Sequence, residues 1–207
     1  MKMVYISHPY TGNEKRNVYE AESISKELSN QFPDIVFINP LNVFKHLQNS
    51  NLSYSEIINQ CIELMHHCDA MIMTGNWRSS KGCMMEYNNA KCPIFEGISS
   101  FRLIKDGRFC EGKKKVFISV PVYGNTKDEV KIQKQEIMKK LEKYNSNIVL
   151  LDSWIDKSDS SLECMGKGLI IMAKADIVVF ANGWENSRGC QVEHVCADAY
   201  GKIIVYV

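Results

Sequence analysis

The chain has 207 residues, a formal net charge of +1 at neutral pH and an apolar fraction of 45%. A charge so close to zero argues against a partner held by bulk electrostatics, such as a nucleic acid polymer or an acidic membrane. No apolar run approaches the length of a membrane span, and the first residues lack the apolar core of a signal peptide. We therefore expect a globular protein of the cytoplasm, with room for one large or two small domains.

The predicted elements alternate between strand and helix, in two rounds. Short apolar runs rich in β-branched and aromatic residues predict the strands, and a period of 3.6 predicts the helices. The first round places strands at 3–7, 35–39, 70–74 and weakly at 93–96, and helices at 14–31 and 54–67. The second places strands at 116–119, 148–152, 177–181 and 202–207, and helices at 127–144 and 162–174. This order predicts an α/β protein with flavodoxin- or Rossmann-like parallel sheets and flanking helices.

The second round repeats the first. Residues 69–86 (DAMIMTGNWRSSKGCMME) recur as residues 176–193 (DIVVFANGWENSRGCQVE), at an offset of 107 residues. The first strand and its loop recur at an offset of 112, and each round contains one Ser-x-x-Glu capping box. An internal duplication follows, with one repeat at 1–96 and the other at 113–207. Residues 97–112 are then a linker, in which we expect a short hairpin.

The eight cysteines include no C-x-x-C spacing. Zinc sites usually need closer pairing, and several of these cysteines fall on predicted core-facing helix positions. We therefore expect reduced, buried thiols, with neither a metal ion nor another cofactor.

The candidate ligand-binding residues follow the strand ends. Ligands of parallel sheets bind beyond the carboxyl ends of the strands, and two loops of each repeat leave that edge. Small loop residues let a ligand approach the backbone, and free N–H groups at a helix start favour an anion such as phosphate. The candidates are Ser7, Pro9, Gly12, Ser80 and Gly82 in the first repeat and Ser119, Pro121, Gly124, Ser187 and Gly189 in the second. The alternative for the motif serines is that they only cap their helices.

A glutamate follows each motif loop. Glu86 and Glu193 lie four residues after the loop glycine, one turn into the predicted helix. Helical side chains point back toward the N-terminus, so each glutamate faces its loop. A glutamate in a first turn is often only a surface residue that suits the helix dipole. Its recurrence at the same place in both repeats favours a functional role.

Two other recurring pairs have plainer interpretations. Asp69 and Asp176 precede a strand, where an aspartate is usually a turn or cap residue. Trp77 and Trp184 are more typical of loop packing than of stacking on a base, but both remain candidate substrate contacts.

These motifs resemble the nucleoside 2-deoxyribosyltransferase superfamily. The resemblance lies in a strand followed by Ser-x-Pro, an aspartate before a strand, and Ser-x-Gly-Cys-x-x-Glu, and it covers both halves. The Ser-x-Gly-x-x-x-Glu core is also similar to that of the 2'-deoxynucleoside 5'-phosphate N-hydrolases. The resemblance implies that Glu86 and Glu193 are nucleophiles at the anomeric carbon, and that the Ser-x-Gly loops hold the 5' end of the sugar or its phosphate. It also implies that Tyr10 and Tyr123 orient the glutamate or the sugar.

The chain departs from this family at the group that protonates the departing base. The superfamily usually has an acidic residue in the helix before the third strand, where this chain has Cys61 and Gly168. Asn39 and Asp152, at the end of the second strand, are the alternatives for that role. The first repeat also has Asn76 in place of the motif glycine, so the second motif is the better preserved.

We therefore expect an N-ribosyl hydrolase or transferase that cleaves the N-glycosidic bond of a (deoxy)nucleoside or a nucleoside 5'-monophosphate. A carboxylate can trap the oxocarbenium-like state through which such bonds break. One alternative is a catalytically degenerate nucleotide-binding or sensing module of the same fold, and a weaker one is a protein-binding role for the loops. The enzymes that the chain resembles are symmetric dimers, so we expect an intramolecular pseudo-dimer that can also form a homo-oligomer.

Overall fold

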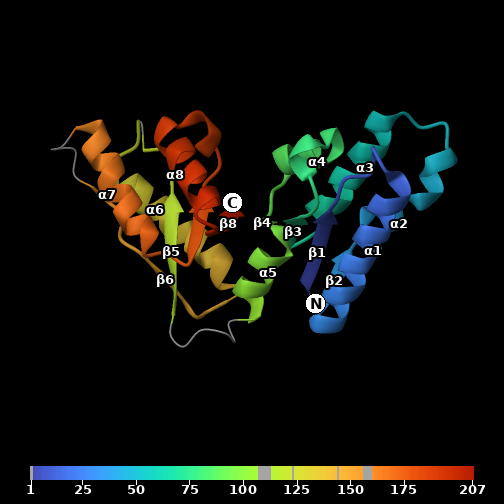
Figure 1. The fold of residues 1–207 in the computed structure, drawn as a ribbon, viewed down its shortest axis with the longest axis horizontal. Helices are drawn as coiled ribbons and strands as arrows, with labels where there is room; N and C mark the ends of the chain where they lie inside the picture. Colours follow the sequence, from blue (N-terminus) through green and yellow to red (C-terminus); the bar gives the residue numbers. More distant parts are fainter. Residues whose placement is uncertain (1, 107–112, 123, 144, 156–159) are drawn as a thin grey trace. The chain divides into compact units, whose positions relative to one another are not determined.

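The computed structural model describes residues 2–106, 113–122, 124–143, 145–155 and 160–207, with only the backbone at 48–49 and 103–106. The chain divides into two compact units, Met1–Ile98 and Ser99–Val207. Each unit consists of parallel strands flanked by helices (Figure 1). An internally duplicated α/β protein with flavodoxin- or Rossmann-like sheets is therefore confirmed.

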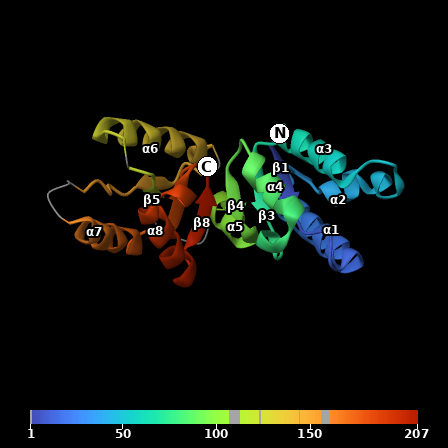
Figure 2. The same ribbon diagram turned by 90° about the horizontal axis from the view of Figure 1, so that it is seen from above.

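The first unit has its four strands in the order β2-β1-β3-β4, with every described pairing parallel. Its strands are β1 (Lys2–Ser7), β2 (Ile35–Ile38), β3 (Ala70–Met73) and β4 (Ile94–Glu96). Its α-helices are α1 (Glu14–Gln31), α2 (Pro40–Val43), α3 (Tyr54–His66) and α4 (Lys81–Asn89), with 3-10 turns at Lys45–Asn49 and Trp77–Ser79. The crossovers put α1 on one face of the sheet and the packed pair α3 and α4 on the other (Figure 2).

The second unit repeats this topology in the order β6-β5-β7-β8, again parallel throughout. Its strands are β5 (Lys114–Ser119), β6 (Ile148–Leu150), β7 (Ile177–Phe180) and β8 (Ile203–Tyr206). Its helices are α6 (Lys127–Glu142), α7 (Ser161–Ala173) and α8 (Arg188–Ala199), with a 3-10 turn at Trp184–Asn186. In Figure 2, α6 lies on one face of this sheet and α7 and α8 lie on the other.

The linker is helical where we expected a hairpin. Helix α5 (Gly97–Asp106) begins directly after β4, and residues 107–112 lie outside the described part of the chain. Gly97 has a φ of +77°, which turns the backbone out of the strand without a side-chain clash. Ile98 and Phe101 then stand at a helical spacing, and Phe101 is buried. That period was the signal against a hairpin.

The strands form the core of each unit. Val4, Tyr5 and Ile6 of β1 are fully buried, as are Val178 and Val179 of β7. Strands buried on both faces are what sheets covered by helices on both sides require. The loop edges of both sheets are therefore the places where polar side chains reach solvent.

Local polar contacts hold the elements at these positions. The backbone N–H of Met3 donates to Asp69 Oδ2 at 2.8 Å, and that of Lys115 donates to Asp176 Oδ2 at 2.7 Å. Both aspartates thus tie a strand start to its neighbour, in line with a structural role. The predicted capping boxes at Ser53 and Ser160 are both present.

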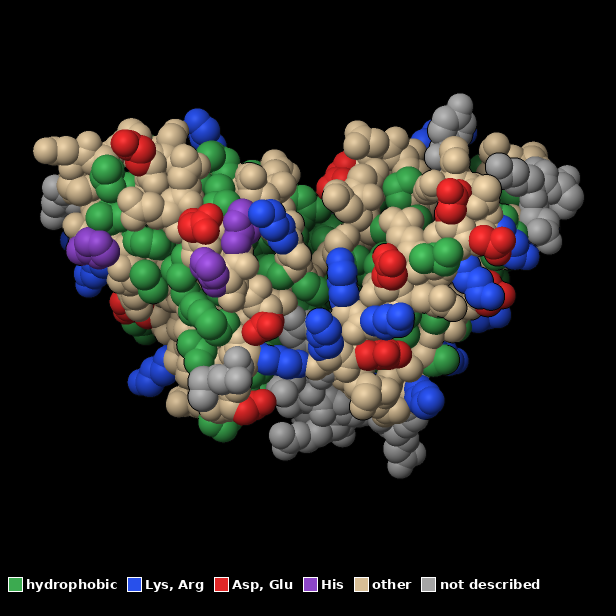
Figure 3. Space-filling view, turned by 180° about the vertical axis from the view of Figure 1, so that it is seen from behind, with side chains coloured by type: hydrophobic (Ala, Val, Ile, Leu, Met, Phe, Trp, Pro, Cys, Tyr) green, Lys and Arg blue, Asp and Glu red, His purple; other side chains and the backbone are tan. Residues whose placement is uncertain are grey.

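The surface carries charges of both signs. Over the face shown in Figure 3, Lys and Arg side chains alternate with Asp and Glu side chains. None of the described helices combines the length and the apolar character needed to cross a membrane.

Candidate functional site

Glu86 of the first unit is held by two hydroxyl groups. Tyr5 donates to Oε1 and Ser7 donates to Oε2, each at 2.5 Å. Side chains alternate along a strand, so Tyr5 and Ser7 lie on the same face of β1 and reach the first turns of α4 together. Glu86 is 5% exposed, so both carboxylate oxygens are satisfied inside the protein. Burial raises the Glu86 pKa, and the two hydroxyl donors lower it by less.

Neighbouring side chains also close the loop of the first unit. A Cβ on Gly82 would stand 2.7 Å from the Tyr54 hydroxyl, so the tyrosine lies directly over this glycine. Burial raises the Tyr54 pKa, while a hydrogen bond from the Gly82 backbone lowers it. The thiol of Cys61 is also close, because the charge of Glu86 adds to burial in raising the Cys61 pKa to about 12. Tyr54 therefore lies beside Gly82, whose backbone N–H is one of the donors that we expected to face an anion.

Glu193 of the second unit is more open. Ser119 donates to its Oε2 at 2.5 Å, as Ser7 does in the first unit. Phe117 takes the place of Tyr5 and has no hydroxyl group, so Oε1 has no hydrogen-bond donor within the described residues. A Cβ on Gly168 would lie 3.3 Å from this oxygen. One oxygen of Glu193 therefore accepts no hydrogen bond from the described residues and lies beside Gly168 of helix α7.

A lysine lies near Glu193 that sequence reasoning missed. Lys134 of α6 donates to Ser153 Oγ at 2.5 Å, and its charge acts on both Glu193 and Asp152. Burial lowers the Lys134 pKa, and the two carboxylates raise it by less. The available signal was its place on the apolar face of the helix, four residues after Val130 and three before Ile137.

The two glutamates share the direction of their pKa shift but differ in its causes. Burial raises the Glu193 pKa, whereas the Ser119 hydroxyl and the Lys134 charge lower it. Nothing cationic contributes to the Glu86 pKa. The second unit therefore combines a half-buried carboxylate, a carboxylate oxygen without a hydrogen-bond donor among the described residues, and a nearby ammonium group, whereas the first unit has only the carboxylate.

The motif serines cap their helices. Ser80 Oγ accepts from the Cys83 backbone N–H at 3.4 Å, and Ser187 Oγ accepts from that of Cys190 at 3.5 Å. The capping interpretation thus holds for both residues. Gly189 keeps more room than Gly82, because its nearest contact for an added Cβ is the flexible Met165 side chain at 3.2 Å. Anion binding at Ser187 and Gly189 stays a prediction.

The tryptophans pack against their own units. Trp184 stacks on His194 with ring centroids 4.2 Å apart, and Trp77 lies against Tyr87 at 5.1 Å. Arg78 lies over the Trp77 ring at 4.4 Å and pairs with Glu96. These contacts favour loop packing for both tryptophans.

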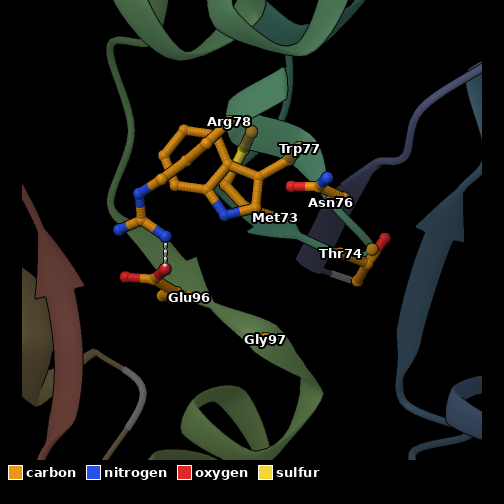
Figure 4. A pocket seen from close by; sticks show the side chains of 8 residues that line it. Met73, Thr74, Asn76, Trp77, Arg78, Glu96 and Gly97 are labelled. Atoms are coloured by element: carbon orange, nitrogen blue, oxygen red, sulfur yellow. Dashed lines mark hydrogen bonds and ion pairs between the residues drawn. The ribbon is translucent and has the colours of Figure 1, made fainter. Parts of the chain in front are cut away.

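A pocket of about 190 Å³ in the first unit adjoins this tryptophan. It lies beyond β3 and β4, and Figure 4 shows the Arg78–Glu96 pair bridging from the motif loop to the end of β4. Met73, Thr74 and Asn76 line the side nearest β3. The pocket borders the motif loop, but neither Glu86 nor Ser80 lines it.

In the loops that follow β1 and β5, the structure brings few of the predicted site residues to the glutamates. Tyr10 contributes its backbone carbonyl to Asn17, and the hydroxyl on Glu86 comes from Tyr5 instead. Tyr123 lies outside the described residues, so its role and that of the Tyr10 hydroxyl stay predictions. Gly12 and Gly124 both have a positive φ, which suits the turns after β1 and β5. Pro9 and Pro121 are half-buried in the same loops.

The two residues after the second strands differ in their surroundings. Asn39 is buried and caps α2 by accepting from the Leu41 N–H at 3.0 Å, while its Nδ2 has no hydrogen-bond partner among the described residues. Asp152 is exposed, accepts from the Trp154 N–H at 3.1 Å and lies near Lys134. Of the two, Asp152 is the residue that the structure connects to a catalytic candidate.

The fold and this edge define a duplicated α/β protein with a buried glutamate at the start of one helix in each unit. The family described as Domain of unknown function (DUF4406) matches residues 2–95 and again residues 114–206, and the chain belongs to this family. Comparison with curated protein sequences finds no match. Among solved structures, a crystal structure of arylmalonate decarboxylase is similar at 11% identity and a TM-score of 0.26, over 100% of this chain and 87% of that one. So low a TM-score carries no argument about function.

Proposed function

We propose that the protein cleaves the N-glycosidic bond of a (deoxy)nucleoside or nucleoside 5'-monophosphate, with Glu193 as the nucleophile. The observation that carries the proposal is Oε1 of Glu193, which accepts no hydrogen bond from the described residues and lies beside Gly168 at the loop edge of a parallel sheet. The Ser119 hydrogen bond fixes Oε2, so the free oxygen is the one that can reach an anomeric carbon. The resemblance of both motifs to nucleoside 2-deoxyribosyltransferases supplies the reaction class.

The proposed chemistry needs an ionised carboxylate. As the C–N bond breaks, positive charge develops at the anomeric carbon, and the carboxylate traps it as a glycosyl ester. Water then releases the sugar, or an acceptor base takes it. Burial raises the pKa of Glu193 and so favours the protonated form, but Ser119 and Lys134 oppose that effect. The Ser119 hydrogen bond and the Lys134 charge therefore favour the ionised form that the proposed reaction needs.

Incubation with a panel of nucleosides and nucleoside 5'-monophosphates tests the proposal, with free base measured by chromatography. Glu193→Gln is expected to lower base release on the order of 10³-fold or more, since the amide is not a nucleophile. Glu136→Gln is the matched control, because Glu136 is exposed on α6. Absence of base release from every member of the panel would contradict the proposal.

The Glu86→Gln variant separates the two units. If only the second unit turns over substrate, this variant keeps most of the activity and Glu193→Gln loses nearly all of it. If both units act, each single variant loses part and the double variant loses everything. Base release that survives the double variant would remove both glutamates from the reaction.

A second function is favoured by the first unit. Glu86 has both oxygens satisfied and Tyr54 covers Gly82, which suits a degenerate binding or sensing module better than an enzyme. Thermal shifts with nucleotides distinguish the two, since a ligand of the native state raises stability as RT ln(1 + [L]/Kd). Stabilisation without base release supports binding alone.

A further inference from the structure

The second unit has no carboxylic acid at the helix position that faces its glutamate. Gly168 occupies that position, as its 3.3 Å distance from an added Cβ to Glu193 Oε1 indicates. Loss of an N-glycosidic base as an anion is difficult, so a proton donor on the leaving-group side has to come from another element. The groups facing Glu193 are Ser119, Cys190 and Lys134.

We propose that Lys134 is the proton donor to the departing base, an inference that rests on the proposed function. Among the described residues, its ammonium group is the cation that acts on Glu193, and Lys134 belongs to α6, which lies on the face of the sheet opposite α7 and α8. Lys134 Nζ lies at Ser153, just after β6, and Glu193 lies at Ser119, the last residue of the paired strand β5, so both groups stand at the same edge of the sheet. A substrate between them would meet a nucleophile on one side and a proton on the other.

Two other groups lie beside the Lys134 side chain at this edge of the sheet. Ser153 accepts its hydrogen bond at 2.5 Å, and Asp152 contributes a second negative charge nearby. Lys127, the other lysine near this loop, instead lies over the Trp154 ring at 5.6 Å. Burial makes Lys134 a better acid than an exposed lysine, since it lowers the Lys134 pKa. An ammonium of ordinary pKa would release its proton too reluctantly for this role.

The first unit provides an internal comparison. The offset of 113 residues that relates β2 to β6 also relates Leu28 to Leu141, and it pairs Ala21 with Lys134. Ala21 is fully buried, so no cation faces Glu86 from helix α1. A lysine thus lies near Glu193, and alanine takes its place near Glu86. This difference is expected if Lys134 takes part in the reaction.

The steps balance in protons and electrons. In the first, Glu193 Oε1 bonds to the anomeric carbon, the C–N electron pair passes to the base nitrogen, and Lys134 transfers a proton to that nitrogen. In the second, water attacks the anomeric carbon, the C–O bond to Glu193 breaks, and neutral Lys134 takes a proton from the water. Both residues return to their starting states.

The test compares two leaving groups on the sugar that the panel identifies. One is the natural base, and the other is 4-nitrophenolate, which departs as a stable anion without a proton. Lys134→Met is expected to slow release of the natural base about 10² to 10⁴-fold, the range for loss of a general acid, and release of 4-nitrophenolate by less than about tenfold. Lys131→Met, which changes an exposed lysine one turn earlier, is the matched control and should slow neither.

The pH dependence of activity distinguishes a proton donor from a lysine that only supports the structure. Lys134→Met is expected to remove the loss of activity at high pH, where wild-type Lys134 would lose its proton, and to shift the acidic limb upward, because Glu193 loses a nearby cation. Lys134→Arg keeps the charge but does not release a proton, so it should keep the acidic limb and stay slow on the natural base. An equal loss on both substrates, or no loss on either, would overturn the role of Lys134 while leaving N-glycosidic cleavage standing. A wild-type protein that releases no base overturns both.

Discussion

Gly168 stands beside Glu193 with no side chain between them, so the carboxylate keeps one oxygen free. In the first unit Cys61 fills the equivalent helix position, and Tyr5 caps the equivalent oxygen of Glu86 at 2.5 Å. The same motif thus has two different surroundings. Both oxygens of Glu86 accept hydrogen bonds from their own unit, whereas only one oxygen of Glu193 does so. The difference arises from two positions outside the shared motif, Cys61 against Gly168 and Tyr5 against Phe117, since the motif serine, glycine and glutamate are identical in both.

Gly168→Ala tests whether that open side is used. The added Cβ would lie 3.3 Å from Glu193 Oε1, a tight contact that fills the approach to this oxygen. We expect base release or nucleotide binding to fall at least about tenfold, with stability unchanged or raised by up to about 1 kcal/mol, since alanine favours a helix over glycine. Gly166→Ala in the same helix is the matched control, because its Cβ would meet nothing within 4 Å. A full retention of activity in both variants would show that ligands approach from elsewhere.

Tyr5→Phe tests the closed site. The change removes one of the two donors to the buried Glu86 carboxylate and leaves the ring in place. We expect the free energy of unfolding to fall by about 1 to 3 kcal/mol, the usual cost of an unmet buried hydrogen bond to a charged group. Chemical denaturation measures it, with Tyr19→Phe as control, since Tyr19 is 70% exposed. Equal stability of the two variants would mean that Glu86 is protonated or hydrated without Tyr5.

Much of the fold was predictable because its signals are local. The strands could be found from short apolar runs, and the capping serines Ser53 and Ser160 marked two helix starts. The hairpin prediction failed at 97–106, where Ile98 and Phe101 carry a helical period that the glycine before them obscured. Some element ends moved inward and others outward by one or two residues. Strand β2 ends before the predicted residue because Asn39 caps α2 instead of continuing the strand.

The site was predictable only where it lies within the motif. Glu86 and Glu193 reach the loop edge as the helix geometry required, and Cys61 and Gly168 both adjoin the glutamate of their unit. The neighbours that distinguish the units come from distant elements, so no spacing in the sequence revealed them. Lys134 was visible as a charge on an apolar helix face, but nothing in the sequence indicated that it lies near Glu193.

Removing each capping box tests whether the two repeats gain the same stability from this shared feature. Ser53 and Ser160 each accept from the backbone N–H of a glutamate three residues later, at 3.3 Å in both units. Ser53→Ala and Ser160→Ala should therefore each cost about 1 kcal/mol of stability. Hydrogen exchange of α3 and α7 measures the two losses separately. Ser23→Ala, at an exposed position within α1, is the control and should change little; a loss confined to one box would show that the repeats differ in local stability.

The Glu86→Gln variant should differ from the wild type in how its free energy of unfolding depends on pH. The folded pKa of Glu86 is raised above its ordinary value of 4.5, chiefly by burial. A group of this kind contributes stability that is fully present below the unfolded pKa and is lost as the pH rises through the folded pKa. The wild-type protein should therefore lose stability as the pH rises from about 4.5, and Glu193, shifted in the same direction, adds to the loss.

The glutamine variant removes one of these two contributions. Its side chain can accept from Tyr5 and donate to Ser7, so the buried hydrogen bonds survive without a charge to desolvate. We expect Glu86→Gln to match or exceed the wild-type free energy of unfolding at pH 8 and to lose that relative advantage near pH 4. Denaturation across this pH range measures it, with the exposed Glu136→Gln as control. A wild-type curve parallel to that of Glu86→Gln would mean that Glu86 titrates alike in the folded and unfolded chains, and that its burial is compensated by groups other than Tyr5 and Ser7.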